Sequence, residues 1–378
     1  SQMDKPEHSL FESGGRTTGG IEPSDYSFES KTKVVQESEA QSDYFIEDSD
    51  DAADFEIEAQ DKTESSGNLN VKNILRDSEE KYGSAIRGMI SFFTIRKQDI
   101  GQQEVDAMER KFYLAPVIGG IFAVILALEM LGMYILGYYL GFPMEVTAVI
   151  TVATVLIGSK FLHFDGLVDF GDGMVASGNK EKHVAAMKDS KIGAGGFGLA
   201  LVVVLFTVFL YSYAAWWFLP MFFIIPITEI LVKNAMVSAA ANGTPGDGMA
   251  ASQVRNADND TAIKSAMISA ALSFVGLVVI VVLSWVINKI YMHYYDGPWT
   301  TPLFSNFGLF FASMFIALIA GILVSMYVGK RMAKVADETF GSTSGDILGA
   351  TNEIARPVVS VVLLLVFLLM YRVLAFII

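Results

Sequence analysis

An uncharged run of 37 residues occupies positions 192–228, with the sequence IGAGGFGLALVVVLFTVFLYSYAAWWFLPMFFIIPIT. A helix that crosses a bilayer needs about 20 mainly apolar residues, so this stretch is too long for one crossing. Tyr211, Tyr213, Trp216 and Trp217 lie near its middle, and such aromatic residues are common where a helix leaves the membrane. The stretch therefore predicts two membrane-spanning helices joined by a tight turn at the membrane surface.

Apolar segments of similar length recur along the rest of the chain. Seven candidates lie near residues 112–137, 144–162, 194–212, 216–239, 264–288, 303–328 and 356–376. No repeat of fixed period is visible, so the pattern does not support a transporter built from inverted repeats. The predicted fold class is all-α, a polytopic membrane helix bundle with about seven transmembrane helices that forms one catalytic domain over residues 112–378.

Most of the charge lies before these segments. The 378 residues carry a formal net charge of −14, although 52% are hydrophobic and the mean hydropathy is +0.43. Residues 1–80 hold 21 Asp and Glu against 7 Lys and Arg, whereas residues 81–378 hold 20 of each. We therefore expect a disordered acidic tail over residues 1–80 and a neutral, apolar body. This composition excludes a basic nucleic-acid binder, a disulfide-stapled secreted domain and an ordinary water-soluble enzyme.

Between the tail and the first apolar segment lie residues 81–111. Apolar side chains from Ile86 to Ile95 alternate there with Arg87 and small residues. The apolar part is too short to span a bilayer, so we interpret residues 81–111 as an amphipathic segment at the membrane interface.

The distribution of Lys and Arg predicts the orientation in the membrane. Only Lys289 and Arg372 lie on one side of the seven segments. The other side has Arg96, Lys97, Arg110, Lys111, Lys160, Lys180, Lys182, Lys188, Lys191, Lys233, Arg255, Lys264, Lys330, Arg331, Lys334 and Arg356. Because cytoplasmic loops carry the excess of Lys and Arg, we expect a multi-pass protein of the plasma membrane with a cytoplasmic N-terminus and an external C-terminus.

Three aspartates follow the second apolar segment at helical spacing. Asp165, Asp169 and Asp172 stand at i, i+4 and i+7 and would share one helix face. Carboxylates this close repel one another, and unpaired charge is costly at a membrane, so we expect hard cations, of which Mg²⁺ fits best. His163 is the one histidine beside them; it is a candidate base or phosphate donor, and a structural hydrogen bond explains it nearly as well.

Two further polar segments fall on the same predicted side. Lys188 and Lys191 precede glycines at the start of the third apolar segment, which suits an anion because free backbone N–H groups and the helix dipole attract phosphate. Asp346 and Glu353 stand at i and i+7 before the seventh segment. Two acidic strips on one membrane face could hold a pair of metals about 3.5–4 Å apart, an arrangement used for in-line phosphoryl displacement; the number of metals stays open. The loop over residues 242–248 reads as an ordinary turn that could also close over a substrate.

Charged residues inside the apolar segments also need partners. Glu229 and Lys233 are four residues apart, and we expect them to neutralise each other. Glu129 has no evident partner in the sequence.

Three motifs together resemble a known family. They are His163-x-Asp165-Gly166-Leu167-x-Asp169-x-x-Asp172-Gly173, Met187-Lys188-Asp189-Ser190-Lys191-Ile192-Gly193 and Gly345-Asp346-x-x-Gly349-Ala350-Thr351-x-Glu353. Over roughly residues 85–378 the chain is similar to adenosylcobinamide-GDP ribazoletransferases, also called cobalamin-5'-phosphate synthases, and Ser91-Phe92-Phe93-Thr94-Ile95 resembles the opening of that family. Val168, Phe170 and Lys191 depart from the family pattern, and Lys191 replaces a bidentate arginine fork by a point charge. The fourth segment lacks the arginine expected there, for which Lys233 would substitute.

The resemblance implies a Mg²⁺-dependent integral membrane enzyme in the last assembly step of cobalamin (vitamin B12). It would join adenosylcobinamide-GDP to α-ribazole or α-ribazole 5'-phosphate and release GMP. The implied catalytic residues are His163, Asp165 and Asp169. The implied metal ligands are Asp165, Asp169, Asp172, Asp346 and Glu353, and the implied phosphate- or substrate-binding residues are Lys188, Asp189, Lys191, Lys233 and Asn352. The expected partners are these substrates and the lipid bilayer, with no nucleic acid; a homo-oligomer and contacts with other corrinoid-assembly enzymes stay open.

Three other classes of protein use similar residues. A CDP-alcohol phosphotransferase also has membrane aspartates, but its Asp-Gly-x-x-Ala-Arg signature is absent, since Leu-Val-Asp follows Asp165-Gly166. A Mg²⁺-dependent prenyltransferase would release pyrophosphate instead of GMP. A cation transporter would normally place its carboxylates near the bilayer midplane, whereas those of this chain lie at the predicted span ends.

Overall fold

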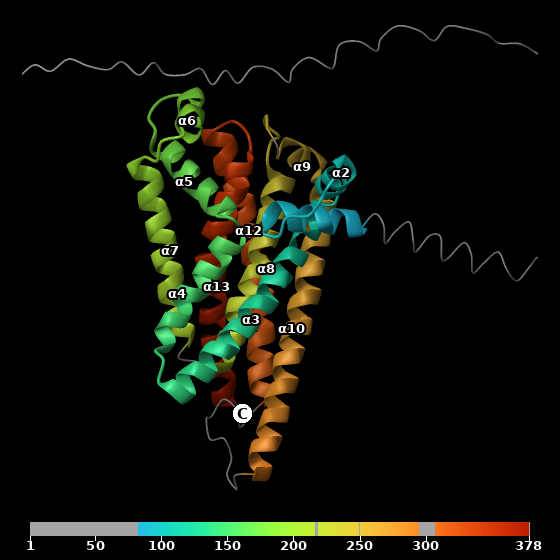
Figure 1. Ribbon diagram of the computed structural model, residues 1–378, viewed down its shortest axis with the longest axis vertical. Coiled ribbons are helices and arrows are strands. Elements are labelled where there is room, and N and C mark those ends of the chain that lie inside the picture. The colour runs from blue at the N-terminus through green and yellow to red at the C-terminus, as the bar shows by residue number, and fades with distance from the viewer. Residues whose placement is uncertain (1–81, 216–217, 249, 295–306, 378) are drawn as a thin grey trace, which may run out of the picture. The chain divides into compact units, whose positions relative to one another are not determined.

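The computed structural model describes residues 82–215, 218–248, 250–294 and 307–377. Regular structure in these ranges is helical, apart from one isolated β-bridge between Pro245 and Thr343 (Figure 1). The predicted all-α class is therefore confirmed. The acidic tail predicted over residues 1–80 lies outside the described residues.

The helices follow one another along the whole described chain. A helix over residues 82–93 precedes α2 (Gln102–Arg110), the 3₁₀ helix η1 (Phe112–Leu114) and α3 (Ala115–Leu140). Next come α4 (Met144–Gly158), α5 (Leu162–Val175), α6 (Lys180–Met187), α7 (Ala194–Ala215) and α8 (Phe218–Asn242). The last are α9 (Ala251–Asn256), α10 (Asn259–Tyr294), α12 (Phe307–Thr339) and α13 (Gly345–Ile377).

Six helices of the described chain are long and apolar enough to cross a membrane: α3, α7, α8, α10, α12 and α13. α4 and α5 make a seventh candidate crossing only as a pair, which is bent by 91°. The structure thus agrees with about seven crossings, but the predicted second segment, residues 144–162, is wrong as a straight span because α4 ends at Gly158. The uncharged stretch contributes two separate helices that contact each other, α7 up to Ala215 and α8 from Phe218, which confirms the prediction of two helices. Trp216 and Trp217 lie outside the described residues.

α8 is the central helix of the bundle. It packs against α3, α10, α12 and α13. In its apolar 18-residue stretch 94% is buried, compared with 17% for the corresponding stretch of α10. Two glycines allow this packing, since a Cβ on Gly119 of α3 or Gly329 of α12 would overlap the backbone of α8. Small residues let helices approach closely in a membrane, so α8 can bring its polar side chains against several neighbours at once.

The bend between α4 and α5 is formed by Lys160 and Phe161, which both have a φ of +57°. Residues other than glycine rarely adopt this left-handed conformation, which costs about 1–2 kcal/mol per residue. The Lys160 ammonium donates to the Ser91 carbonyl at 3.0 Å, and the Gly158 carbonyl accepts from the Ile95 N–H at 2.8 Å. Two hydrogen bonds with the segment before α2 therefore stabilise the bend.

After the bend, α5 runs toward the end of the bundle where α6 and α9 lie, which we call the α6 end (Figure 1). The turn between α3 and α4 and the C-terminus of the chain lie at the opposite end. The bend therefore places the aspartates of α5 among the connections of the α6 end.

We predict that Phe161→Asn stabilises the protein against unfolding in detergent. Asn tolerates the left-handed conformation better than Phe, and the Phe161 side chain is already 47% exposed, so relief of strain should contribute up to about 1 kcal/mol. Thermal unfolding measures the effect. Phe197→Asn, at a 63% exposed position within α7, is the matched control, and an equal gain there would contradict the strain explanation.

Candidate active site

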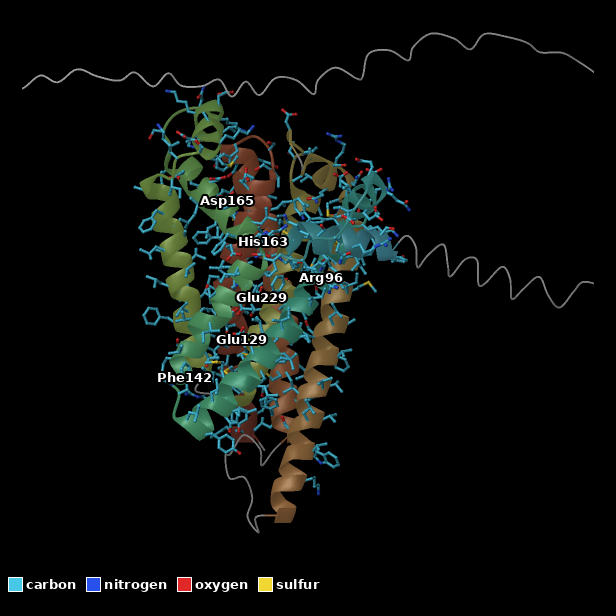
Figure 2. All side chains as sticks on the ribbon, in the orientation of Figure 1. Arg96, Glu129, Phe142, His163, Asp165 and Glu229 are labelled. Atoms are coloured by element: carbon cyan, nitrogen blue, oxygen red, sulfur yellow. The ribbon has the colours of Figure 1, made fainter. Side chains whose placement is uncertain are left out.

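Carboxylates from two helices gather at the α6 end. Asp165 and Asp169 lie on α5, whereas Asp346 lies in the first turn of α13 and accepts from the Ser344 hydroxyl at 3.4 Å. A Cβ on Gly166 of α5 would lie 2.7 Å from the Asp346 carbonyl oxygen, which shows how closely the helices approach there. The small residues that the sequence places in both motifs thus bring the two acidic strips together. Figure 2 shows Asp165 and His163 on α5.

Negative charge accumulates around Asp169. The charges of Asp165, Asp346 and Asp172 all act on its carboxylate, and the positive charge of Lys188 acts on Asp346. Within the described ranges, neither the Asp165 nor the Asp169 carboxylate has a hydrogen-bond or ion-pair partner. We call Asp165, Asp169 and Asp346 together the carboxylate group. This set of side chains carries more negative charge than the surrounding side chains neutralise.

This donor set fits a hard divalent cation in its chemistry. Carboxylate oxygens are the ligands that Mg²⁺ prefers, and Asp165, Asp169 and Asp346 offer them from two adjacent helices. Among the residues that the structure describes, however, no three His, Asp or Glu side chains already stand in a metal-binding arrangement. A bound ion would therefore require these side chains to rotate toward one another.

Asp172 contacts different groups from the other aspartates of α5. The N–H of Gly193 donates to Asp172 Oδ2 at 2.7 Å, and the N–H of Gly196 donates to Oδ1 at 2.8 Å. These N–H groups belong to the glycine-rich start of α7, where the sequence suggested a bound phosphate. In the structure a carboxylate of the chain itself lies at this helix start.

The predicted phosphate-binding residues of the second motif lie in the connection between α6 and α7. Lys188, Asp189 and Lys191 are exposed there, and Asp189 Oδ1 accepts from the Lys191 N–H at 3.0 Å. The electrostatic effect of Lys188 on Asp346 associates this connection with the carboxylate group. His183 of α6, which the sequence did not single out, lies with Nδ1 2.8 Å from the Gly173 carbonyl oxygen at the end of α5.

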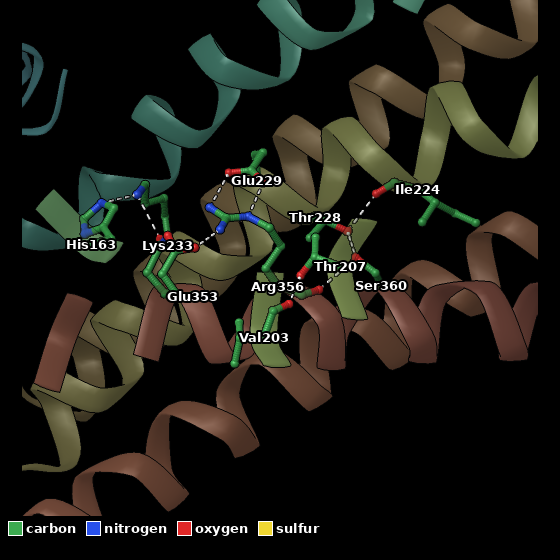
Figure 3. A network of polar contacts seen from close by, with 11 residues as sticks. His163, Val203, Thr207, Ile224, Thr228, Glu229, Lys233, Glu353, Arg356 and Ser360 are labelled. Carbon is green, nitrogen blue, oxygen red and sulfur yellow. Dashed lines mark hydrogen bonds and ion pairs between the residues drawn. The ribbon is translucent and has the colours of Figure 1, made fainter. Parts of the chain in front are cut away.

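The remaining candidates form a second group inside the bundle, which we call the buried network (Figure 3). Its members come from α5, α8 and α13, and each is at most 2% exposed: His163, Glu229, Lys233, Asn352, Glu353 and Arg356. The Lys233 ammonium lies 2.6 Å from His163 Nε2 and donates to Asn352 Oδ1 at 2.8 Å. The Asn352 amide donates to Glu353 Oε1 at 3.0 Å.

Arg356 joins the two carboxylates of the buried network. Its Nε donates to Glu229 Oε1 at 2.8 Å, and its Nη1 donates to Glu353 Oε2. The pairing of Glu229 with Lys233 that the sequence suggested is therefore wrong. Glu229 of α8 pairs instead with Arg356 of α13, whose planar guanidinium fork also binds Glu353 three residues earlier on α13 itself. With Lys233 protonated, two cations balance two carboxylates.

The buried network contradicts two of the sequence-based predictions. Lys233 and Arg356, predicted as loop cations, both lie inside the bundle. The acidic strip at Asp346 and Glu353 does not precede the last helix, because α13 already begins at Gly345. The structure places Glu353 in the buried network and Asp346 in the carboxylate group, so it does not bring all five predicted metal ligands together.

Glu129 of α3 also has partners that the sequence did not reveal. The hydroxyls of Thr151 and Thr154 on α4 both donate to its carboxylate, that of Thr151 at 3.1 Å. Their spacing of three residues puts both hydroxyls on one face of α4, so this acidic side chain is satisfied by an adjacent helix.

Aspartates and lysines at one end of an apolar helix bundle are typical of membrane enzymes that act on phosphate-bearing substrates. The chain belongs to the cobalamin-5-phosphate synthase family, whose model matches residues 85–365. The family indicated by the three motifs is thereby confirmed, and the chain is a multi-pass membrane protein.

Relatives named adenosylcobinamide-GDP ribazoletransferase are similar over most of the bundle. The protein of Methanocella arvoryzae is 28% identical over 285 residues, which cover 72% of this chain and 92% of the relative. That of Methanococcoides burtonii is 26% identical and covers 74% and 91%, and that of Methanosarcina barkeri is 29% identical and covers 43% and 60%. No solved structure matches the chain.

We predict that Arg356→Met strongly destabilises the protein. It leaves Glu229 and Glu353 buried without their cation, and the loss of one partner from a buried ion pair costs about 3–5 kcal/mol. Thermal unfolding in detergent should show a much larger loss for Arg356→Met than for Arg356→Lys, which keeps the charge. Equal losses in both variants would show that the fork geometry, and not the charge balance, determines stability.

Proposed function

We propose that this enzyme joins adenosylcobinamide-GDP to α-ribazole, or to its 5'-phosphate, and releases GMP in the last assembly step of cobalamin. One observation carries the proposal: the family match over residues 85–365 includes Asp165, Asp169 and Asp346, which the fold gathers at one end of the bundle. Two relatives that bear this activity in their names match 72% and 74% of this chain.

In the proposed reaction a ribazole hydroxyl oxygen attacks the phosphorus that carries the cobinamide. A new phosphorus–oxygen bond forms, the bond to the GMP oxygen breaks, and the hydroxyl proton passes to a base. Asp165 suits the role of base better than His163, because its carboxylate is exposed and has no hydrogen-bond partner within the described ranges. His163 is 2% exposed, and its Nε2 faces the Lys233 ammonium.

Asp169 and Asp346 are the residues that we propose to hold Mg²⁺, and Asp165 would remain beside them as the base. When bound, Mg²⁺ would neutralise charge on the diphosphate and on the departing GMP. Lys188 and Lys191 would contact the phosphate oxygens from the connection between α6 and α7. Catalysis of this kind depends mainly on position and electrostatic stabilisation, which suits a site built on closely packed helices.

For the location, we propose the plasma membrane with the α6 end in the cytoplasm. The support is the excess of Lys and Arg in the connections at that end, such as Lys182 and Lys188 between α5 and α7. The excess of Lys and Arg at the α6 end persists when the buried Lys233 and Arg356 are left out of the count.

We predict that the purified protein, given adenosylcobinamide-GDP, α-ribazole and Mg²⁺, releases one GMP for each cobalamin product formed. Asp165→Ala should lower the rate by about 10²–10³, a typical cost of removing one stabilising group. Glu338→Ala, which removes an exposed carboxylate of α12, is the control and should keep the rate. Release of pyrophosphate, or wild-type rates in Asp165→Ala, would overturn this assignment.

We predict that single cysteines report the orientation directly, since the sequence contains no cysteine. Phe142→Cys lies in the turn between α3 and α4, and Ser177→Cys lies between α5 and α6; both positions are exposed. A membrane-impermeant maleimide should label Phe142→Cys in intact cells and Ser177→Cys only after permeabilisation. The reverse pattern would place the α6 end outside.

A further inference from the structure

We propose that Asp172 is a positioning residue and not a metal ligand. In this view it fastens the connection between α6 and α7, so that Lys188 and Lys191 stand beside the carboxylate group and meet the substrate's phosphates. The role in substrate binding rests on the proposed function, whereas the structural role of Asp172 does not.

Both carboxylate oxygens of Asp172 already accept hydrogen bonds. They accept from the N–H groups of Gly193 and Gly196 at 2.7 and 2.8 Å. Bonds from N–H groups at a helix start to a carboxylate are charge-assisted, and the negative charge also interacts favourably with the helix dipole. A metal ion at Asp172 would have to compete with two hydrogen bonds that close the start of the 22-residue helix α7.

The glycines at the start of α7 leave no space for larger residues beside Asp172. A Cβ on Gly193 would overlap the Asp172 carboxylate, and a Cβ on Gly196 would lie 2.7 Å from Asp172 Oδ2. A Cβ on Gly171 would lie 2.8 Å from Gly196 Cα, so the backbones of α5 and α7 are also in close contact beside it. The glycines that looked like a phosphate site in the sequence are instead required by the approach of Asp172.

Helix α5 contacts the elements on both sides of the connection between α6 and α7. Asp172 binds its end at the start of α7, and the adjacent Gly173 carbonyl faces His183 Nδ1 of α6 at 2.8 Å. α6 is also anchored by Lys180, whose ammonium donates to the Asp337 carbonyl of α12 at 2.6 Å. Lys188 and Lys191 lie between these attachments, so the position of their backbone is set by two neighbouring residues of α5.

A consequence for substrate recognition follows. The backbone N–H groups of Gly193 and Gly196 are satisfied by Asp172 and are not available to a phosphate of the substrate. The nucleoside diphosphate part of the substrate would therefore be recognised by the lysine ammonium groups, with their position fixed through Asp172.

The test compares Asp172→Asn with Asp169→Asn, in which a proposed metal ligand is neutralised. Purified protein in nanodiscs is titrated with Mn²⁺ without substrates and followed by electron paramagnetic resonance. Hydrogen exchange of the amides of residues 192–197 is measured on the same samples. The KM values for adenosylcobinamide-GDP and for α-ribazole are determined separately.

For Asp172→Asn we expect a Mn²⁺ dissociation constant within twofold of the wild type and amide exchange at least tenfold faster. The KM for adenosylcobinamide-GDP should rise severalfold, whereas the KM for α-ribazole should not change. For Asp169→Asn we expect at least tenfold weaker Mn²⁺ binding and unchanged exchange. Mn²⁺ binding weakened in Asp172→Asn as in Asp169→Asn, or unchanged exchange in Asp172→Asn, would overturn the proposal.

Gly193→Ala disturbs the same contact without removing any carboxylate, because the added methyl group would collide with the Asp172 carboxylate. It should reproduce the faster exchange and the higher KM, and wild-type values for both would contradict the positioning role. If the wild type releases no GMP, the proposed function fails, while the exchange measurements still decide the structural role of Asp172.

Discussion

The cost of an uncompensated charge in an apolar bundle divides the acidic residues of this chain into two kinds. Glu229 and Glu353 share Arg356, Glu129 accepts from two threonines, and Asp172 closes the start of α7. Within the described ranges, the carboxylates of Asp165 and Asp169 have no such partners. Among the described residues, the fold pairs the acidic groups inside the bundle and leaves the Asp165 and Asp169 carboxylates without a partner where the first and third family motifs meet, as suits an enzyme for phosphate-bearing substrates.

Helix α5 connects these two environments. His163 points from it into the buried network, whereas Asp165, two residues later, is exposed at the α6 end. Residues two apart on a helix face nearly opposite directions, so a single turn of α5 contacts both the ion pairs of α8 and α13 and the carboxylate group. The left-handed pair at Lys160 and Phe161 fixes the direction in which this turn begins.

Local patterns in the sequence predicted much of this architecture. Hydropathy located the crossings, and helical spacing placed Asp165 and Asp169 together; the close approach of α5 and α13 at Gly166 emerged only from the structure. The partner of Glu229 could not be found in this way, because Arg356 lies 127 residues further along the chain and only tertiary packing selects it over the nearby Lys233. The bend after α4 was missed because an apolar segment of the right length conceals a backbone conformation. The role of Asp172 was obscured because its spacing matches that of its neighbours.

The charge balance of the buried network has an electrical consequence. A membrane potential of 100 mV does work of about 2.3 kcal/mol on each elementary charge that it moves across the bilayer. With Lys233 protonated, the two cations and two carboxylates fixed together present no net charge to this field, so changes in the energisation of the membrane exert no net force on this network. A bundle with an unbalanced core would instead have a stability that varied with the metabolic state of the cell.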